Sequence, residues 1–352
     1  MDGREETITM QRAKARVSVG LHISRLWLIG LALGIWVSAL GPSSAQTGLP
    51  KPLSIDEMMQ KPVFRMARLS PSGRYFVAIV ERDLKEHIMF FDVAGDGQPI
   101  ASVGMGDSIV NWVNWVNEDR VLLSFASYRD KFGNMVNYDD LDEVRAARTN
   151  RLLLVNRDGS NPHRLFSGDR QMERYRSTWG IADRLHNDPD HILIPALNQG
   201  DVDLFKVNVN TGAYEVLMEG SYDTVDWKTD GNGRVIFRYD NADTGSGYDV
   251  YARDDQPDGK IKWRRIKKIR FKSERNNEAD DFALIAAGPT SSTYYVSARP
   301  EGADTAAIYL YDFNTDEYVE TLFRHDKIDI TSVIYEPTSR EYLGTFFVED
   351  KL

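Results

Sequence analysis

Ser70-Pro71-Ser72-Gly73-Arg74 is the first of six turn-forming stretches in the chain, each lying between a short, mostly apolar segment and a β-rich run. Proline, glycine, serine and asparagine favour tight turns through their backbone preferences and short polar side chains. The later turn stretches are residues 116–120, 187–191, 229–233, 288–292 and 336–340. The β-rich runs that follow the six turns are residues 75–80, 121–125, 192–197, 235–239, 294–298 and 342–347.

Short strands repeated at a pitch of about 40–50 residues are typical of a β-propeller, in which each repeat forms one four-stranded blade. The sixth repeat has two strand-like segments, residues 330–335 and 342–348, and the sequence ends at Leu352 before a third. We therefore predict an all-β chain whose residues 63–352 form an incomplete β-propeller of about five and a half four-stranded blades. Its unpaired strand edges are expected to lower stability and to favour association edge to edge.

The second repeat carries a long, highly charged insertion, residues 127–149, between its second and third strands. Insertions in propellers form loops on one face, often the face that binds a partner. Within it, residues 137–143 read Asn-Tyr-Asp-Asp-Leu-Asp-Glu, which superficially suggests a calcium-binding loop. Leu141 occupies a ligand position and the loop glycine is missing, so we favour a solvated loop.

Composition narrows the classes of function. The chain has 352 residues, of which 42% are hydrophobic and 11% aromatic, and this predicts a folded core. A formal net charge of -10 disfavours nucleic acid as a partner, because phosphate binding needs a basic surface. There is no cysteine, which excludes disulfides, thiol catalysis and thiolate metal sites.

One basic stretch, residues 260–272, alternates lysine and arginine with Ile261, Trp263, Ile266 and Ile269. This pattern favours an outer strand with one solvated face. The alternative is a contact surface for an acidic partner or for anionic lipid.

Residues 1–45 predict a signal peptide, followed by a linker over residues 46–62 in which residues 54–59 favour a short helix. Basic residues precede an apolar stretch, residues 26–40, and a small-residue cleavage site ends at Ala45. The apolar stretch is shorter than the roughly twenty residues that span a bilayer, so membrane attachment is expected only if the signal remains uncleaved. Acidic residues near the start make Met10 an alternative initiation site. Export without cysteine is typical of a bacterial periplasm or envelope.

The order of several features resembles the N-terminal half of exported prolyl oligopeptidase family serine peptidases, in the dipeptidyl- and acylaminoacyl-peptidase branch. Residues 69–76 (Leu-Ser-Pro-Ser-Gly-Arg-Tyr-Phe) and 152–165 are similar to blades of such propellers, as are residues 333–344. Trp112 and Trp115, which precede the charged insertion, fit the same order. The resemblance covers about residues 51–352 and implies a propeller of about seven blades followed by an α/β-hydrolase domain, which this sequence does not contain.

No catalytic residue is assigned. The family nucleophile lies in a Gly-x-Ser-x-Gly turn, and the sequence has no such pentapeptide. The nearest match, Gly245-Ser246-Gly247, falls in a polar loop that we interpret as a link between strands.

No cofactor-binding or metal-ligating residue is assigned either. His186 and His191 flank the third turn together with Asp188 and Asp190, and imidazole with carboxylate suits zinc or manganese. Solvation of the turn explains the Asn-Asp-Pro-Asp sequence better.

The resemblance implies the substrate-gating propeller domain of a prolyl oligopeptidase-like serine peptidase, not catalytic by itself, which restricts access to short peptides. The partners so implied are an α/β-hydrolase domain missing from this chain and peptides as substrates of the intact enzyme. The alternative is a free-standing envelope β-propeller that binds a protein or peptide partner.

Overall fold

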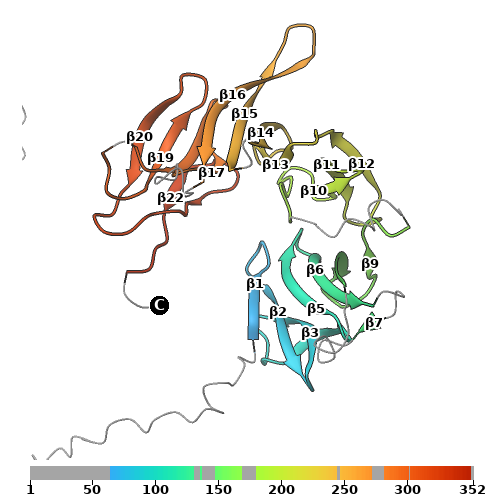
Figure 1. Ribbon diagram of the computed structural model, residues 1–352. Coiled ribbons are helices and arrows are strands. Elements are labelled where there is room, and N and C mark those ends of the chain that lie inside the picture. Colours follow the sequence, from blue (N-terminus) through green and yellow to red (C-terminus); the bar gives the residue numbers. More distant parts are fainter. Residues whose placement is uncertain are drawn as a thin grey trace, which may run out of the picture. The chain divides into compact units, whose positions relative to one another are not determined.

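The computed structural model describes residues 64–130, 135–136, 147–168, 180–243, 246–271, 281–300 and 302–349. Within these ranges every regular element is a β-strand and every strand pair is antiparallel (Figure 1). All of them belong to one unit of the chain, Pro62–Leu352. The predicted signal peptide, linker and short helix lie outside the described residues. In the described part, no helix has the length and apolar character needed to cross a membrane.

The strands form six sheets, one for each predicted repeat. The first contains β1 (Phe64–Leu69), β2 (Tyr75–Arg82), β3 (Lys85–Asp92) and β4 (Pro99–Gly104). The second contains β5 (Ile109–Trp115), β6 (Arg120–Arg129), β8 (Ala147–Asn156) and β9 (His163–Arg164), with β7 (Met135–Val136) beside β6. The third contains β10 (His191–Asn198), β11 (Asp201–Asn208) and β12 (Tyr214–Met218).

The later sheets follow the same pattern of neighbouring strands. The fourth contains β13 (Thr224–Thr229), β14 (Val235–Asn241), β15 (Gly247–Asp255) and β16 (Ile261–Arg270). The fifth contains β17 (Phe282–Ala287), β18 (Thr293–Ala298), β19 (Ala307–Asp312) and β20 (Glu317–Phe323). The sixth contains β21 (Ile334–Tyr335) and β22 (Tyr342–Gly344).

Each of the six predicted turns leads into the second strand of its repeat. In the first turn, the Gly73 N–H donates to the Ser70 carbonyl at 2.9 Å and the Ser70 N–H donates to the Tyr75 carbonyl at 2.8 Å. Gly73 has a φ of 73°, a left-handed conformation that glycine adopts without steric cost. In the third repeat the segment before the turn pairs only through a bridge between Asp183 and Leu193.

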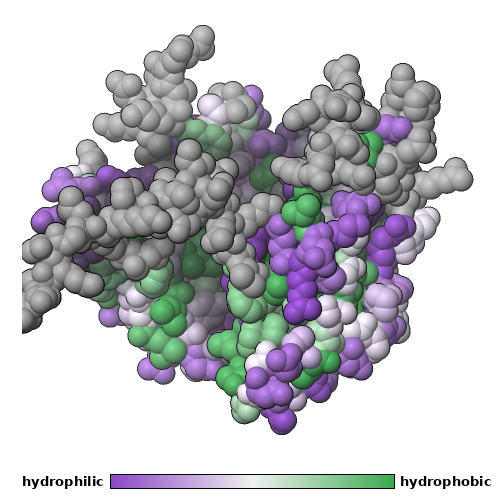
Figure 2. All heavy atoms as spheres, turned by 90° about the horizontal axis from the view of Figure 1, so that it is seen from below, coloured by the Kyte–Doolittle hydropathy of each residue, from purple (hydrophilic) through white to green (hydrophobic). Residues whose placement is uncertain are grey.

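Burial follows the strand order within a sheet. In β2, residues 77–80 are buried consecutively, because both faces of this strand are covered. The outermost strands β12 and β20 are mostly exposed, and β4 alternates between half-buried and exposed positions. On the face shown in Figure 2, hydrophobic residues of the described part are interspersed with hydrophilic ones.

Apolar clusters fill the spaces between consecutive sheets, from the first to the fifth. Phe90 of the first sheet contacts Trp115 of the second edge-on, with ring centroids 6.0 Å apart. Phe237 of the fourth contacts Tyr294 of the fifth at 5.0 Å. Consecutive sheets of neighbouring antiparallel strands, stacked through their apolar faces, define a β-propeller. The chain has this fold, as the turns predicted.

Three local features differ from the sequence-based expectation. The β6–β8 ladder continues through Ser127 paired with Thr149 to Arg129 paired with Ala147, so both ends of the predicted insertion are strand. Polar side chains there obscured the pattern, whereas the ladder depends on backbone hydrogen bonds. The first strand of the third repeat is reduced to one bridge, and β21 and β22 are shorter than predicted.

Candidate functional site

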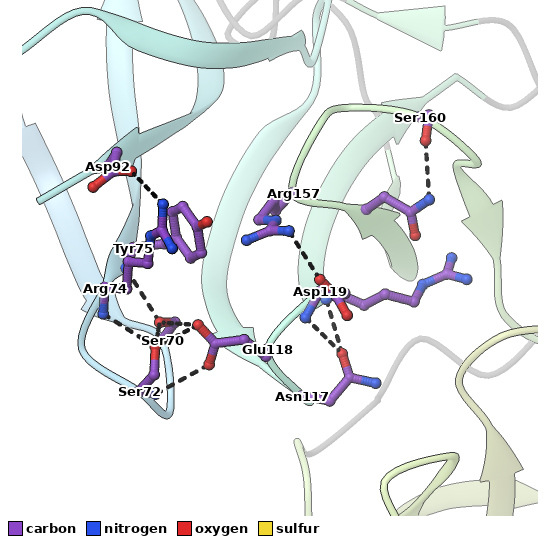
Figure 3. Close-up of polar contacts among 12 residues, drawn as sticks. Ser70, Ser72, Arg74, Tyr75, Asp92, Asn117, Glu118, Asp119, Arg157 and Ser160 are labelled. Carbon is purple, nitrogen blue, oxygen red and sulfur yellow. Dashed lines mark hydrogen bonds and ion pairs between the residues drawn. The ribbon is translucent and has the colours of Figure 1, made fainter. Parts of the chain in front are cut away.

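The second turn holds the first through one carboxylate, that of Glu118 (Figure 3). Its Oε1 accepts hydrogen bonds from Ser70 Oγ at 2.9 Å and Ser72 Oγ at 2.5 Å, and its Oε2 accepts from the Ser72 N–H at 3.0 Å. Burial by itself would raise the pKa of Glu118, but the hydrogen bonds from Ser72 and Ser70 and the charge of Arg157 outweigh it and hold the pKa below its usual range. Glu118 thus joins the first two sheets as an ionised acceptor.

Arg157 adds a second link between these two sheets. Its guanidinium lies 4.1 Å from the ring centroid of Tyr75 and makes an ion pair of 3.1 Å with Asp119 (Figure 3). A cation over an aromatic face is attractive, and it is most so where water is partly excluded.

Later turns are linked in the same manner. A polar side chain of one turn contacts the turn of another sheet. Such contacts join the second turn to the third, the third to the fourth, and the fourth to the sixth. The contacts are Asn117 Nδ2 to the Pro189 carbonyl at 3.0 Å, Asn187 Nδ2 to Asn232 Oδ1 at 2.9 Å, and Arg340 Nη2 to Asp230 Oδ2 at 3.7 Å. The turns therefore lie together on one side of the sheets.

A pocket of about 520 Å³, here called the pocket among the turns, is lined in part by the fourth and sixth turns. Its walls come from β5, the segment 180–186, β13 with the turn after it, β17, and the last turn. Pockets that hold small ligands have volumes of about 300–1,000 Å³. The apolar lining includes Ile181, Trp227 and Ile285, and charged side chains interrupt it.

Three carboxylates line the pocket, and each already accepts hydrogen bonds within the protein. Asp183, which is 5% exposed, accepts the backbone N–H groups of Leu185 at 2.8 Å and Gly233 at 2.9 Å. Asp226 accepts a hydrogen bond from Lys228 Nζ at 2.6 Å. Asp230 accepts hydrogen bonds from the backbone N–H groups of Asn232 at 2.8 Å and Arg234 at 3.1 Å.

Two hydrogen-bond donors in the pocket, Arg184 and Tyr335, have no hydrogen-bond or ion-pair partner among the described residues. Arg184 is exposed at the pocket, and partial desolvation lowers the pKa of its guanidinium; Tyr335 opposes this, and the positive charge of Arg68 adds to it. Arginine nevertheless stays charged, because its ordinary pKa lies far above neutrality. Burial raises the pKa of Tyr335, against the influence of Arg184, so its hydroxyl stays protonated and able to donate.

The histidines and aspartates of the third turn do not gather into one site. His191 Nδ1 lies 2.8 Å from Asp188 Oδ1, and Lys206 Nζ lies 3.0 Å from the other oxygen of this carboxylate. These two partners hold the pKa of Asp188 below its usual range. Asp190 accepts a hydrogen bond from Asn210, whereas His186 lines the pocket. In the described ranges, no three histidine or acidic side chains are placed to hold a metal ion.

The basic stretch 260–272 forms the outermost strand of the fourth sheet, β16, as predicted, with Lys272 outside the described residues. Several of its cations make polar contacts within the protein, and Arg265 and Arg270 share one carboxylate. The contacts are Arg264 to the Phe313 carbonyl at 2.8 Å, Arg265 to Asp249 at 3.3 Å, Lys267 to Asp316 at 2.8 Å and Arg270 to Asp249 at 3.2 Å. This arrangement favours the solvated outer strand over a surface built for an anionic partner.

Two further sequence features have limited structural description. The calcium-loop look-alike, residues 137–143, lies outside the described residues, as does Gly245 of the Gly-Ser-Gly stretch. Gly247 begins β15, so that stretch leads into a strand. A catalytic serine turn would instead lead from a strand into a helix.

The residues that build the site were not predicted from the sequence. Glu118 lies in a predicted turn, but its serine partners are more than 40 residues away in sequence. Arg184 lies beside Asp183 in a segment of mixed polarity before the third turn, so its charge gave no distinct signal. For Tyr335, the sequence indicated only an aromatic residue in a β-strand.

Comparisons with known proteins found no matching family description and no matching curated protein. Among solved structures, Pyrococcus horikoshii acylaminoacyl peptidase is 14% identical, with a TM-score of 0.41, over 80% of this chain and 43% of its own. Porphyromonas gingivalis dipeptidyl peptidase 4 is 14% identical, with a TM-score of 0.38, over 70% and 37%. A β-propeller domain from Myceliophteria thermophila is 13% identical, with a TM-score of 0.37, over 77% and 75%. The chain thus spans about two fifths of the length of the two peptidases.

Proposed function

We propose that this chain is a peptide-binding propeller that gates access to a serine peptidase of the prolyl oligopeptidase type. The observation that carries the proposal is the pocket among the turns, whose walls come from successive sheets. The order of turn and strand motifs that resembles this peptidase family supports it. The chain would supply binding and selection, and a partner α/β-hydrolase domain would supply the nucleophile.

The lining of the pocket suits a short peptide. Apolar surface from Ile181 and Ile285 would contact side chains, while Arg184 and Tyr335 offer donors to carbonyl or carboxylate oxygens. A rigid rim suits a gate as well, because the two turns that line the pocket, the fourth and the sixth, are linked by the ion pair between Arg340 and Asp230. Selection by such a rim would exclude folded proteins by size.

Labelling of active serines tests the link to a peptidase. An antibody against the propeller is used to precipitate the native protein from producing cells, and the precipitate is treated with a fluorescent fluorophosphonate. We expect a labelled serine hydrolase in the precipitate, either on the same polypeptide or on a bound one. The recombinant chain of residues 1–352 should remain unlabelled. Labelling of the recombinant chain, or a precipitate without any labelled species, would contradict the peptidase role and favour the free-standing binder.

We also propose that the protein acts in the envelope, because residues 1–45 carry the features of an export signal. Sequencing the N-terminus of the protein from fractionated cells tests this. A start near Gln46 in the periplasmic fraction is expected, and an intact leader in the cytoplasmic fraction would be evidence against export.

A further inference from the structure

The pocket among the turns contains acidic and basic side chains in equal number, but their hydrogen-bonding states differ. The acidic ones, Asp183, Asp226 and Asp230, are engaged by donors of the protein. Of the basic ones, Lys228 is paired with Asp226, and Arg340 lies near Asp230 at 3.7 Å. Arg184 has no such partner in the described part of the chain.

Tyr335 lines the same pocket as Arg184, and each affects the pKa of the other. Its ring packs near that of Tyr295, with centroids 6.3 Å apart, which helps to fix the ring plane. The Tyr295 hydroxyl in turn donates to the Arg340 carbonyl at 2.6 Å and ties the fifth sheet to the last turn. Tyr335 therefore presents its own hydroxyl from a supported position, without a hydrogen bond to any described residue.

The guanidinium of Arg184 only donates hydrogen bonds, and the neutral phenol of Tyr335 can donate as well as accept, so a group with several acceptor lone pairs can satisfy both. An ionised carboxylate fits this description, and arginine binds it through two parallel N–H···O hydrogen bonds. A cationic or amide group would find no unengaged carboxylate in the pocket. We propose that Arg184 and Tyr335 form a carboxylate-binding subsite that selects peptides with a free C-terminus or an acidic side chain. This proposal rests on the proposed peptide-binding function.

The experiment measures binding of four N-acetylated tripeptides to the full chain by calorimetry. The first pair is trialanine with a free carboxylate and its C-terminal amide. The second pair is the amide of Ala-Glu-Ala and that of Ala-Gln-Ala. Tighter binding of the free acid identifies the peptide terminus as the recognised group, and tighter binding of the glutamate peptide identifies an acidic side chain.

Variants connect the preference to the subsite. Arg184→Met keeps an unbranched stem and removes the charge, and we expect it to weaken binding of the preferred peptide roughly 10- to 100-fold, as for loss of a charge-assisted contact. Arg184→Lys should restore part of the affinity, since it keeps the charge without the planar fork. Tyr335→Phe should weaken binding by roughly 2- to 10-fold. The matched control is Arg74→Met, because Arg74 is an exposed arginine outside the pocket.

The possible failures are distinguishable. If all four peptides bind equally well and Arg184→Met leaves their affinities unchanged, the carboxylate subsite is refuted while peptide binding stands. If no peptide binds the unaltered chain, the proposed function itself is refuted. Thermal melts of each variant verify that the fold is retained.

Discussion

Removal of the Glu118 carboxylate should loosen the contact between the first two sheets. In Glu118→Ala, the hydroxyls of Ser70 and Ser72 and the N–H of Ser72 lose their common acceptor. No other described side chain replaces it as an acceptor for the Ser72 N–H, so water would take this role. The substitution changes the turn region without touching the apolar cluster between the sheets.

The magnitude follows from the number of bonds and their exposure. A hydrogen bond to a charged group contributes about 1.5–3 kcal/mol when buried. Glu118 is half-exposed, and water screening reduces the contribution of its three hydrogen bonds to about 1–2 kcal/mol in total. For a folded unit of this size, such a loss lowers the melting temperature by roughly 2–4 °C.

Urea denaturation followed by tryptophan fluorescence measures the change. The matched control is Glu317→Ala, because Glu317 is an exposed glutamate whose side chain makes no hydrogen bond or ion pair to any described residue. We expect a lower midpoint for Glu118→Ala and an unchanged midpoint for the control. Equal midpoints for both variants would refute the view that this carboxylate holds the two turns together.

The same carboxylate predicts a dependence on pH. Since its pKa is lowered in the folded protein, Glu118 stabilises the fold above the unfolded value of about 4.3, and this contribution is lost as pH falls through the folded pKa. The difference in unfolding free energy between the unaltered chain and Glu118→Ala should therefore narrow between neutral pH and about pH 3. A constant difference over this range would contradict the assignment of a charged acceptor.

Three further predictions concern the blades. Phe237→Ala removes a fully buried ring that contacts Tyr294, and the resulting cavity should lower the free energy of urea unfolding by about 3–5 kcal/mol. A decrease below about 1 kcal/mol would contradict tight packing between the fourth and fifth sheets. Tyr294→Phe removes the hydroxyl that donates to the Thr229 carbonyl at 3.2 Å and should cost about 1 kcal/mol in the same assay. Gly247→Ala would force a Cβ against the Ile269 carbonyl, so faster amide exchange is expected in β15 and β16, and unchanged exchange would contradict this.

Local chemistry explains why the fold was predictable from the sequence. Turns such as Ser70–Arg74 contain residues that change the direction of the backbone whatever surrounds them, and the apolar run at residues 77–80 requires a strand covered on both faces. Repetition then implied one packing solution for every unit. The outer-strand interpretation of residues 260–272 also held, because alternation of charged and apolar residues records the exposure of one face.

The site was not predictable in the same way, since it depends on contacts between distant segments. Arg184 and Tyr335 are about 150 residues apart in sequence and come to line one pocket only when the sheets are stacked. The interaction of Glu118 with Ser70 likewise requires the register of two sheets. The extension of β6 and β8 into the charged insertion depends on backbone hydrogen bonds, which leave no mark in side-chain polarity.

Hydrogen–deuterium exchange of the full chain, with and without a saturating peptide, tests most directly whether the pocket among the turns is the binding site. We predict slower exchange in residues 180–186, 226–231 and 335–340, the segments that contribute residues to the pocket lining. Exchange in the outer strand β16 should stay the same. Protection confined to β16 or to other outer strands, with no change at the pocket, would contradict the account.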